Sequence, residues 1–450
     1  MTSRDPVATA EQMRRLEDRT ANGGEGLWRL MKAAGEGAAR HAAIRAAGRG
    51  VLVLAGPGNN GGDGYVMASA LKRFGVNVAV AALASPGTDL CKRAAELWGG
   101  PVQPLDQAKS RPVLVDALFG TGLSRTLGAD VLKPLLTHAE AAELVLALDL
   151  PSGVGSDDGT LLPDAPRCDE TYAFGWLKPG HLLQPGADHV GRITRVDIGL
   201  APPSPELFRN QAPEKAAVAP TAHKYDRGHV VVAAGAMPGA AFLSARAAQR
   251  GGAGFVTIGA ENGDQGPPTS IVYRALHDLD LDRVDVIIAG PGLGRDDHAA
   301  EIAAFVLEQQ RAMVIDGDMF SLFAGEPKRF RDLDAILTPH EGEFGRLFGE
   351  LNGSKIDRVR RAADLCGSVV VLKGRDTVIA APGGRAIIND HAHPRLAVAG
   401  SGDVLAGIVA AEFAMRGDAF VAACAGVWRQ GDAGLRATDS LIAEDLLDLL

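Results

Sequence analysis

Residues 51–64 read VLVLAGPGNNGGDG, an apolar run that continues into a loop rich in glycine. The apolar part predicts a buried strand, and the glycines, which tolerate positive φ, predict a tight turn into a helix. Amide groups at the start of such a helix face an anion, so the pattern indicates a nucleotide-like ligand. Asn59, Asn60 and Asp63 add oxygens that a phosphate-binding turn does not need, so the loop is expected to bind more than phosphate. A purely structural turn is the alternative interpretation.

The composition sets the class of protein. With 450 residues the chain is longer than most domains with a single hydrophobic core, so two or more domains are expected. Apolar residues make up 46% and charged residues 22%, which is typical of a folded α/β protein and argues against disorder. A net charge of −9 argues against nucleic-acid binding, which requires a basic surface.

Cysteine spacing and the N-terminal sequence bear on the compartment. Cys91, Cys168, Cys366 and Cys424 are far apart, so neither a zinc site nor a disulfide framework is predicted. The first twenty residues are polar, and no apolar run is long enough to cross a bilayer. We therefore expect a cytoplasmic protein without a membrane partner.

Strands and helices alternate through the first half of the chain. Strands are predicted at 51–55, 76–83, 112–116 and 144–149, the pattern of a parallel sheet covered on both faces. Ligands of such sheets bind at the carboxyl ends of the strands. GPGNNGGDG, DALFGTG and DLPSG follow the first, third and fourth strands, so these motifs are expected to converge on one site.

A proline-rich stretch without periodicity separates the two halves. It predicts a linker at 206–222 between domains at 1–205 and 223–450. The second domain repeats the alternation, which predicts another α/β layer structure. Its strands are expected at 229–234, 254–258, 285–289, 312–316, 334–338 and 368–372, before the motif GSGDVLAG and a helical C-terminus.

Oxygen-bearing side chains at three strand ends indicate a cation. Asn60, Asp116 and Ser152 would suit a monovalent or alkaline-earth ion, although each alone could be a helix cap or turn residue. The segment Gly120–Arg125, GTGLSR, offers backbone donors, hydroxyls and a guanidinium, which predicts a second phosphate clamp. A solvated surface position is the alternative for Arg125.

Asp149 follows the apolar strand ELVLAL and would emerge at the rim of the sheet. Poor solvation there raises a carboxyl pKa toward the range of general acid/base catalysis, although a structural cap is the competing role. Lys178, in the apolar segment TYAFGWLKPG, is a further polar candidate for the site, but a surface lysine that extends its ammonium group into water is the favoured interpretation.

The second domain carries its strongest motif at residues 400–407, GSGDVLAG. Its glycines expose amides at a helix start, and Asp403 could accept a proton from a hydroxyl that attacks a phosphoryl group. A helix cap is the alternative for Asp403. His340 and Glu343 in TPHEGEF and the segment Lys373–Thr377 follow other strands, and the latter could contact nucleotide phosphates or ribose. GPGLGR at 290–295 is a weak signal alone.

Taken in order, these motifs resemble the family of bifunctional NAD(P)H-hydrate repair enzymes. In that family an NAD(P)HX epimerase domain precedes an ADP-dependent NAD(P)HX dehydratase domain. The resemblance covers nearly the whole chain and rests on GPGNNGGDG, VDALFGTGLSR, DLPSGV, GPGLG, LTPHEGE, VVLKGRDT and AGSGDVLAG.

The resemblance implies a Rossmann-like three-layer domain followed by a ribokinase-like α/β domain. It implies that the first binds the hydrated nucleotide through Asn59, Asn60, Gly61, Gly62, Asp63, Gly120, Thr121, Gly122, Leu123, Ser124, Arg125, Thr126 and Asp149, and potassium through Asn60, Asp116 and Ser152. In the second, the hydrated substrate would contact Ala240, Gly294, His340 and Asp403, and ADP would contact Lys373, Gly374, Arg375, Asp376, Thr377 and Gly402.

The implied substrates are NADHX, NADPHX and ADP. The first domain would interconvert the R and S hydrates with the help of Asp149. The second would dehydrate the S form with Asp403 as base and Mg²⁺ accompanying ADP, giving AMP and phosphate. A homo-oligomer is expected. The rival interpretation is a small-molecule kinase of ribokinase-like fold with a nucleotide-sensing N-terminal domain.

Overall fold

The computed structural model describes residues 5–121, 127–163, 165–203, 206–214, 221–261 and 270–450. The predicted clamp residues Gly122, Leu123, Ser124, Arg125 and Thr126 lie outside these ranges. The chain forms two compact units, Pro6–Pro205 and Glu206–Leu450, the second together with Met1–Asp5. Each unit is described separately below.

The first unit contains the predicted parallel sheet. Its order is β4-β3-β2-β5-β6-β7-β8, and every neighbouring pair is parallel. The order reverses at the junction of β2 and β5, which is the switch point where α/β sheets bind ligands. The strands are β2 Val51–Ala55, β3 Val78–Ala82, β4 Val102–Pro104, β5 Val113–Ala117, β6 Leu144–Leu148, β7 Glu170–Phe174 and β8 Arg192–Val196.

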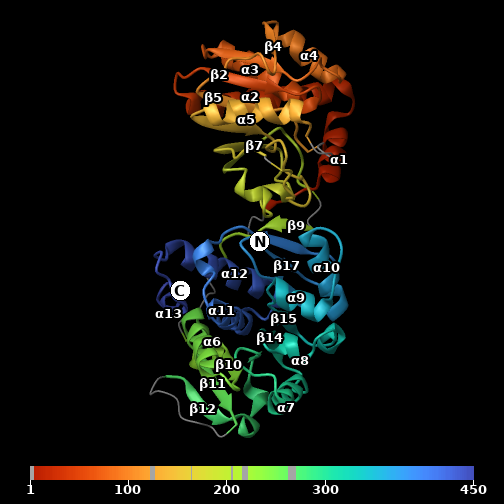
Figure 1. The fold of residues 1–450 in the computed structure, drawn as a ribbon. Helices are drawn as coiled ribbons and strands as arrows, with labels where there is room; N and C mark the ends of the chain where they lie inside the picture. The colour runs from red at the N-terminus through yellow and green to blue at the C-terminus, as the bar shows by residue number, and fades with distance from the viewer. Residues whose placement is uncertain (1–4, 122–126, 164, 204–205, 215–220, 262–269) are drawn as a thin grey trace. The chain divides into compact units, whose positions relative to one another are not determined.

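Helices cover both faces of this sheet, giving the expected three layers (Figure 1). The alternating side chains of β2 separate two cores. Val51, Val53 and Ala55 pack with α2 and α3, whereas Leu52 and Leu54 pack with α5. Burial on both faces explains why the strands read as continuous apolar runs. The helices are α1 Ala10–Ala21, α2 Gly24–Ala46, α3 Asn59–Arg73, α4 Asp89–Trp98 and α5 Ala129–Ala141.

The second unit is built on an eleven-stranded sheet of order β1-β9-β18-β17-β16-β15-β14-β13-β10-β11-β12. Its central strands are parallel from β16 to β12, while β17 is antiparallel to both of its neighbours. The bounds are β1 Asp5–Pro6, β9 Leu207–Arg209, β10 His229–Ala233, β11 Phe255–Ala260, β12 Val272–Ala275, β13 Val286–Ala289, β14 Ala312–Ile315, β15 Ala335–Leu337, β16 Val369–Leu372, β17 Thr377–Ala380 and β18 Ala386–Asn389.

Two groups of helices cover the faces of this second sheet (Figure 1). One face packs against α6 Pro238–Gly251, α11 Ser401–Arg416 and α12 Ala419–Arg436, which share a continuous apolar core with the strands. The other face carries α7 Asp297–Leu307, α8 Met319–Leu322, α9 Glu341–Phe348 and α10 Lys355–Cys366. The short helix α13 Ala443–Asp448 packs against α6 and α11. Both units are therefore α/β, as predicted.

The predicted linker at 206–222 contains a strand that sequence reasoning missed. β9 pairs in parallel with β18, with Leu207 opposite Ala386 and Phe208 opposite Ile387. Leu207 and Phe208 are buried, so this segment belongs to the sheet of the second unit. Three residues are too few to display a strand periodicity, and the neighbouring prolines concealed them.

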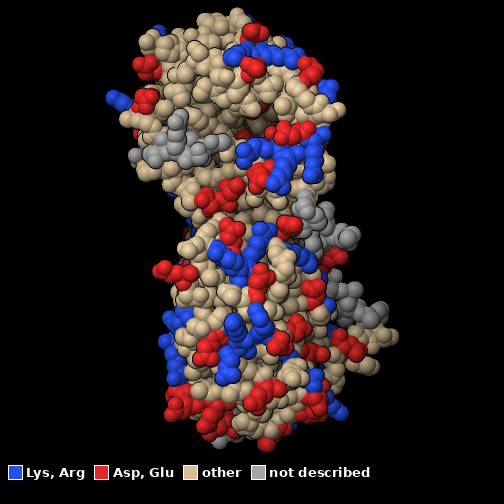
Figure 2. Space-filling model, turned by 90° about the vertical axis from the view of Figure 1, so that its right-hand side faces the viewer, with Lys and Arg blue, Asp and Glu red and all other residues tan. Residues whose placement is uncertain are grey.

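Several surface and side-chain features complete the fold. All four cysteines are buried, and none of them forms a disulfide in the described residues. On the face shown in Figure 2, Lys and Arg side chains lie in small groups bordered by Asp and Glu, so neither sign of charge covers that face.

None of the helices in the described ranges combines the length and apolar character needed to cross a membrane.

Candidate active sites

The turn of the first unit is held by close backbone contacts. β2 ends at Ala55 and α3 begins at Asn59, with no side chain capping the helix start. A Cβ on Gly61 would lie 1.8 Å from the carbonyl oxygen of Gly56, so only glycine fits there. Gly62 is similarly pressed against the side chain of Met31. The glycines therefore bring the turn back onto itself and leave the first amides of α3 available to a ligand.

A cavity of about 480 Å³ lies beside this turn, at the carboxyl end of the sheet. Six of the predicted binding residues line it, namely Asn59, Asn60, Asp63, Gly120, Thr121 and Asp149. Gly61 and Gly62 are buried behind the turn instead of lining the cavity. The three motifs predicted to converge do so, because the ends of β2, β5 and β6 are neighbours in the sheet.

Asp149 is held by an ion pair at the cavity wall. Lys178 Nζ donates to Asp149 Oδ1 at 2.5 Å and to the carbonyl oxygen of Phe174 at 2.9 Å. The prediction of a surface lysine was wrong, because Lys178 is only 1% exposed. Its apolar neighbours enclose the ammonium group, and the carboxylate supplies the counter-charge that burial requires.

His181 fixes the backbone of this pair. The backbone N–H of Lys178 donates to His181 Nδ1 at 2.9 Å, so the proton of the neutral ring is on Nε2, which donates to the carbonyl oxygen of Asp149 at 2.6 Å. Burial and the nearby Lys178 lower the pKa of His181 to about 4. Asp149 adopts a left-handed φ of 64°, which is unfavourable for a side-chain-bearing residue, and these bonds hold it there.

Two further carboxyl groups face the same cavity. Burial, followed by the charge of Asp149, raises the pKa of Glu17 to about 7. The pKa of Asp63 is raised well above its ordinary value by burial and by the carboxylates of Asp149 and Glu17. Among the described residues, the cavity lining therefore includes three acids together with two cationic side chains, Lys178 and Arg14.

Of the residues predicted to hold a cation, Asn60 lines the cavity, whereas Asp116 and Ser152 are fully buried and do not line it. Ser152 donates from its hydroxyl to Asp116 Oδ1 at 2.7 Å and from its backbone to Oδ2 at 2.8 Å. Asp116 is fully buried, burial raises its pKa, and within the described residues it forms no ion pair. Both polar atoms of the Asn60 amide are buried without a hydrogen-bond partner among the described residues. Unpaired carboxylate and amide oxygens of this kind fit a cation.

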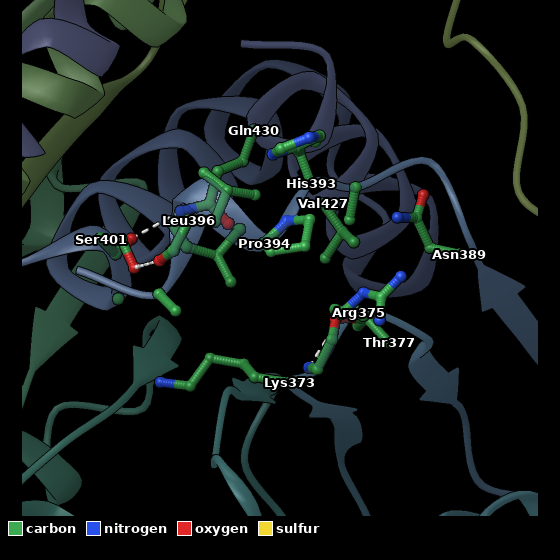
Figure 3. A pocket seen from close by; sticks show the side chains of 16 residues that line it. Lys373, Arg375, Thr377, Asn389, His393, Pro394, Leu396, Ser401, Val427 and Gln430 are labelled. Atoms are coloured by element: carbon green, nitrogen blue, oxygen red, sulfur yellow. Dashed lines mark hydrogen bonds between the residues drawn. The ribbon is translucent and has the colours of Figure 1, made fainter. Parts of the chain in front are cut away.

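The second unit has a cavity of about 270 Å³ at the start of α11 (Figure 3). Five of the six residues predicted to contact ADP line it, namely Lys373, Gly374, Arg375, Thr377 and Gly402. The sixth, Asp376, is buried outside the cavity and accepts a hydrogen bond from Lys355 at 2.6 Å. Asn389, His393, Pro394, Leu396 and Gln430 complete the wall opposite Lys373.

Asp403 lies in the first turn of α11, beside a cluster of charged groups. Burial and then the carboxylate of Asp316 raise its pKa to about 7. Lys373 Nζ donates to Asp316 Oδ1 at 2.7 Å and lies 3.7 Å from Glu343 Oε2. Burial acts to lower the pKa of Lys373, but these acidic neighbours outweigh it and the pKa is raised. The lysine therefore remains a cation that can face a phosphate.

The residues expected to face the second substrate occupy adjoining loops. Gly294 has φ of 96° and donates from its backbone to Asp318 Oδ2 at 3.0 Å. A Cβ on Gly292, in the same loop, would lie 2.9 Å from the Cβ of Ala240, so the glycine loop packs against the start of α6. His340 caps α9 through Nδ1, and its side chain is largely exposed.

Comparison with known proteins assigns the family. A model described as "NAD(P)H-hydrate dehydratase" matches residues 229–450, and one described as "YjeF-related protein N-terminus" matches residues 28–180. The bifunctional NAD(P)H-hydrate repair enzyme Nnr of Escherichia coli is 32% identical over 98% of this chain and 92% of its own. The Salinibacter ruber protein of the same name is 34% identical, over 99% and 95%. This chain belongs to that family.

A solved structure gives a further comparison for the second unit of this repair-enzyme family member. The ADP/ATP-dependent NAD(P)H-hydrate dehydratase from Bacillus subtilis, co-crystallized with ATP/Mg²⁺, is 26% identical. The match covers 52% of this chain and 91% of that one, with a TM-score of 0.43.

Sequence reasoning missed three groups at the sites of this repair enzyme. Asp316 directly follows an apolar strand, as Asp149 does, and this signal was present in IDGD. Lys178 gave no signal, because an apolar neighbourhood fits a buried or a surface lysine equally. Glu17 lies four residues after the buried Met13 on α1. That Glu17 faces a cavity follows only from the packing of α1 in the fold.

Proposed function

We propose that this chain repairs hydrated NAD(P)H in two steps. The first unit interconverts R and S NAD(P)HX, and the second dehydrates (6S)-NAD(P)HX at the expense of ADP, giving NAD(P)H, AMP and phosphate. The observation that carries this proposal is that each unit has a cavity lined by a lysine that interacts with a poorly solvated aspartate, Lys178 with Asp149 and Lys373 with Asp403. Family membership supports both activities.

In the first unit, the turn would bind the nucleotide, and Asp149 would reach its damaged ring. Asn59 is held in place at the turn, because Thr88 donates to its side-chain oxygen at 2.8 Å. Asp149 Oδ2 points toward Gly120, a position where a Cβ would lie 3.5 Å from that oxygen. Gly120 has no side chain to cover this oxygen, and both residues line the cavity. Glycines at 61 and 62 would act by shaping the turn, and residues 122–126 remain predicted contacts.

Potassium is proposed for the first unit. Asn60, Asp116 and Ser152 would hold the ion, which would supply a positive charge that fixes the ligand-binding loops. Asp116 is fully buried without an ion pair among the described residues, and the Asn60 amide lacks a hydrogen-bond partner among them, which supports this assignment. Epimer exchange is expected to be faster in potassium chloride than in tetramethylammonium chloride at equal ionic strength. Equal rates, with equal thermal stability, would argue against the site.

In the second unit, the wall with Asn389 and His393 would receive the adenosine, and Lys373, Arg375 and Gly402 would face the phosphates. Mg²⁺ would enter with ADP and neutralise phosphate charge. The carboxylates of Asp316 and Glu343, next to Lys373, are donors of the kind that Mg²⁺ accepts. Asp376 would act by holding the loop through Lys355.

The chemistry follows from the poor leaving ability of hydroxide. Asp403 would accept the proton of the ring hydroxyl as its oxygen attacks the β-phosphorus of ADP, and AMP would leave. The new phosphate ester would then break its carbon–oxygen bond as the ring nitrogen donates its electron pair. Loss of a proton from the neighbouring carbon restores the ring double bond. Ala240, Gly294 and His340 would line the place of the nicotinamide.

The decisive experiment incubates the protein with hydrated NADH and ADP. We expect NADH absorbance to appear together with AMP and phosphate in equal amounts, and none of these to form without ADP. Accumulation of a stable phosphorylated alcohol, without NADH, would instead favour the small-molecule kinase.

Location and assembly are also proposed. Four buried cysteines without a disulfide fit a reducing cytoplasm. A homo-oligomer is expected, and light scattering during size-exclusion chromatography would give its mass.

A further inference from the structure

Helix α1 contributes an acid to the cavity of the first unit from outside the region that the family model matches. The family model begins at residue 28, whereas α1 spans residues 10–21. Met13 on this helix is buried in the core, and Glu17, one turn later, lies on the same face and lines the cavity. The helix is anchored, because Thr9 and Gln12 form a capping box and the Ala10 backbone donates to Asp157 at 2.7 Å.

The carboxyl group of Glu17 forms no stabilising polar contact with the described residues. It makes no hydrogen bond or ion pair with them, although its neighbours Glu11 and Arg15 pair on the exposed side of the helix. Because Glu17 lines the cavity, its carboxyl group can contact a bound ligand. The cavity it faces also contains Asp149, Asp63 and Lys178.

We propose that Glu17 is the second proton-transfer residue of the first unit, acting as an acid on the hydrated ring while Asp149 acts as the base. This inference rests on the proposed epimerase function. The charged groups that act on Glu17 are Asp149 and Lys178 across the cavity and Asp18 and Arg14 on its own helix, and Asp63 completes the cluster. Its pKa of about 7 would keep much of it protonated near neutral pH.

Epimerisation needs two proton transfers, and the cavity offers both groups. Asp149 would take the proton of the ring hydroxyl. The bond between that carbon and the ring nitrogen would then break, its electron pair passing to nitrogen as a carbonyl forms. Glu17 would give its proton to the nitrogen. After the freed carbon rotates, the nitrogen attacks the other face of the carbonyl, and both protons return to their starting groups. No oxidant or reductant is needed.

The test measures exchange between the separated R and S hydrates of NADH with the full-length protein, after subtraction of the uncatalysed rate. We expect Glu17→Gln to lower kcat about 100-fold with little change in KM, the scale of a positioned proton donor. The wild-type rate should fall as pH rises above about 7, since Glu17 must be protonated. The variant should lack that decline.

The controls separate this inference from the proposed function. Glu11→Gln changes a matched residue on the exposed side of α1 and should exchange epimers at the wild-type rate. Glu17→Asp keeps an acid and should retain more activity than Glu17→Gln. Absence of exchange by wild-type protein would refute the epimerase function itself. If the wild type exchanges the epimers, three results would overturn the role of Glu17. These are an unchanged kcat and pH profile in Glu17→Gln, a change in KM alone, and an equal loss of activity in both Glu17 variants.

Discussion

At the scale of single residues, the ion pair between Lys178 and Asp149 is expected to stabilise the fold as well as to place the proposed catalytic carboxylate. Lys178→Met should lower the free energy of unfolding by about 3–5 kcal/mol, because it leaves a poorly solvated carboxylate without its counter-charge. Urea denaturation would measure this. Adding Asp149→Asn to the same chain should recover part of the loss. Lys92→Met removes an exposed pair with Asp89 and should change the free energy of unfolding little. A similar small cost for Lys178→Met would contradict the buried pair.

A separate prediction concerns Asp403 in the second unit. As a base it must be ionised, so ADP-dependent dehydration should rise with pH through its pKa of about 7 and level off above it. Asp403→Asn should lower kcat about 10²- to 10⁴-fold while ADP binding, followed by calorimetry, largely survives. Parallel loss of ADP affinity would make Asp403 a binding residue instead.

The sequence indicated candidate site residues from two local patterns. Asp149 follows an apolar strand and lines a cavity, whereas Asp403 follows a glycine-rich turn and interacts with Lys373, which lines the other cavity. Residues that depend on packing could not be predicted in this way. To predict the role of Lys178, one must know where Asp149 lies in the fold. To predict the role of Glu17, one must know how α1 is oriented.

At the scale of elements, the turn before α3 depends on two glycines that differ in their surroundings. Gly61→Ala should lower the free energy of unfolding by about 3 kcal/mol, because the added Cβ would collide with the Gly56 carbonyl. Gly58→Ala is a matched control in the same turn, since a Cβ there meets nothing within 4 Å. Its effect should stay near 0.5 kcal/mol. Equal effects of the two changes would show that the turn can relax.

Elements with strong apolar runs were predicted, and short or edge elements were not. The strand at 51–55 matches β2, and 254–258 falls within one residue of the start of β11. β7 and β8 were missed because polar residues interrupt them. β9 has three residues, and its existence depends on pairing with β18, a partner almost 180 residues away. Such pairing is a tertiary property.

At the scale of the whole molecule, each unit has its own core and its own cavity. We therefore expect Asp149→Asn to abolish epimer exchange while dehydration of the pure S hydrate continues at the wild-type rate. Asp403→Asn should do the reverse. Both variants would be assayed for both reactions as full-length chains. Loss of both reactions in either single variant would show that the two sites are coupled.

The buried cysteines have a practical consequence. A thiol must ionise to react, and burial raises the pKa of Cys91 and Cys366 to about 11 and that of Cys168 well above its ordinary value. Cys424 is buried as well. A cysteine introduced at exposed Arg19 on α1 would thus be labelled selectively by a maleimide dye, with every native thiol retained. Fluorescence from that dye could follow nucleotide entry beside α1 in real time.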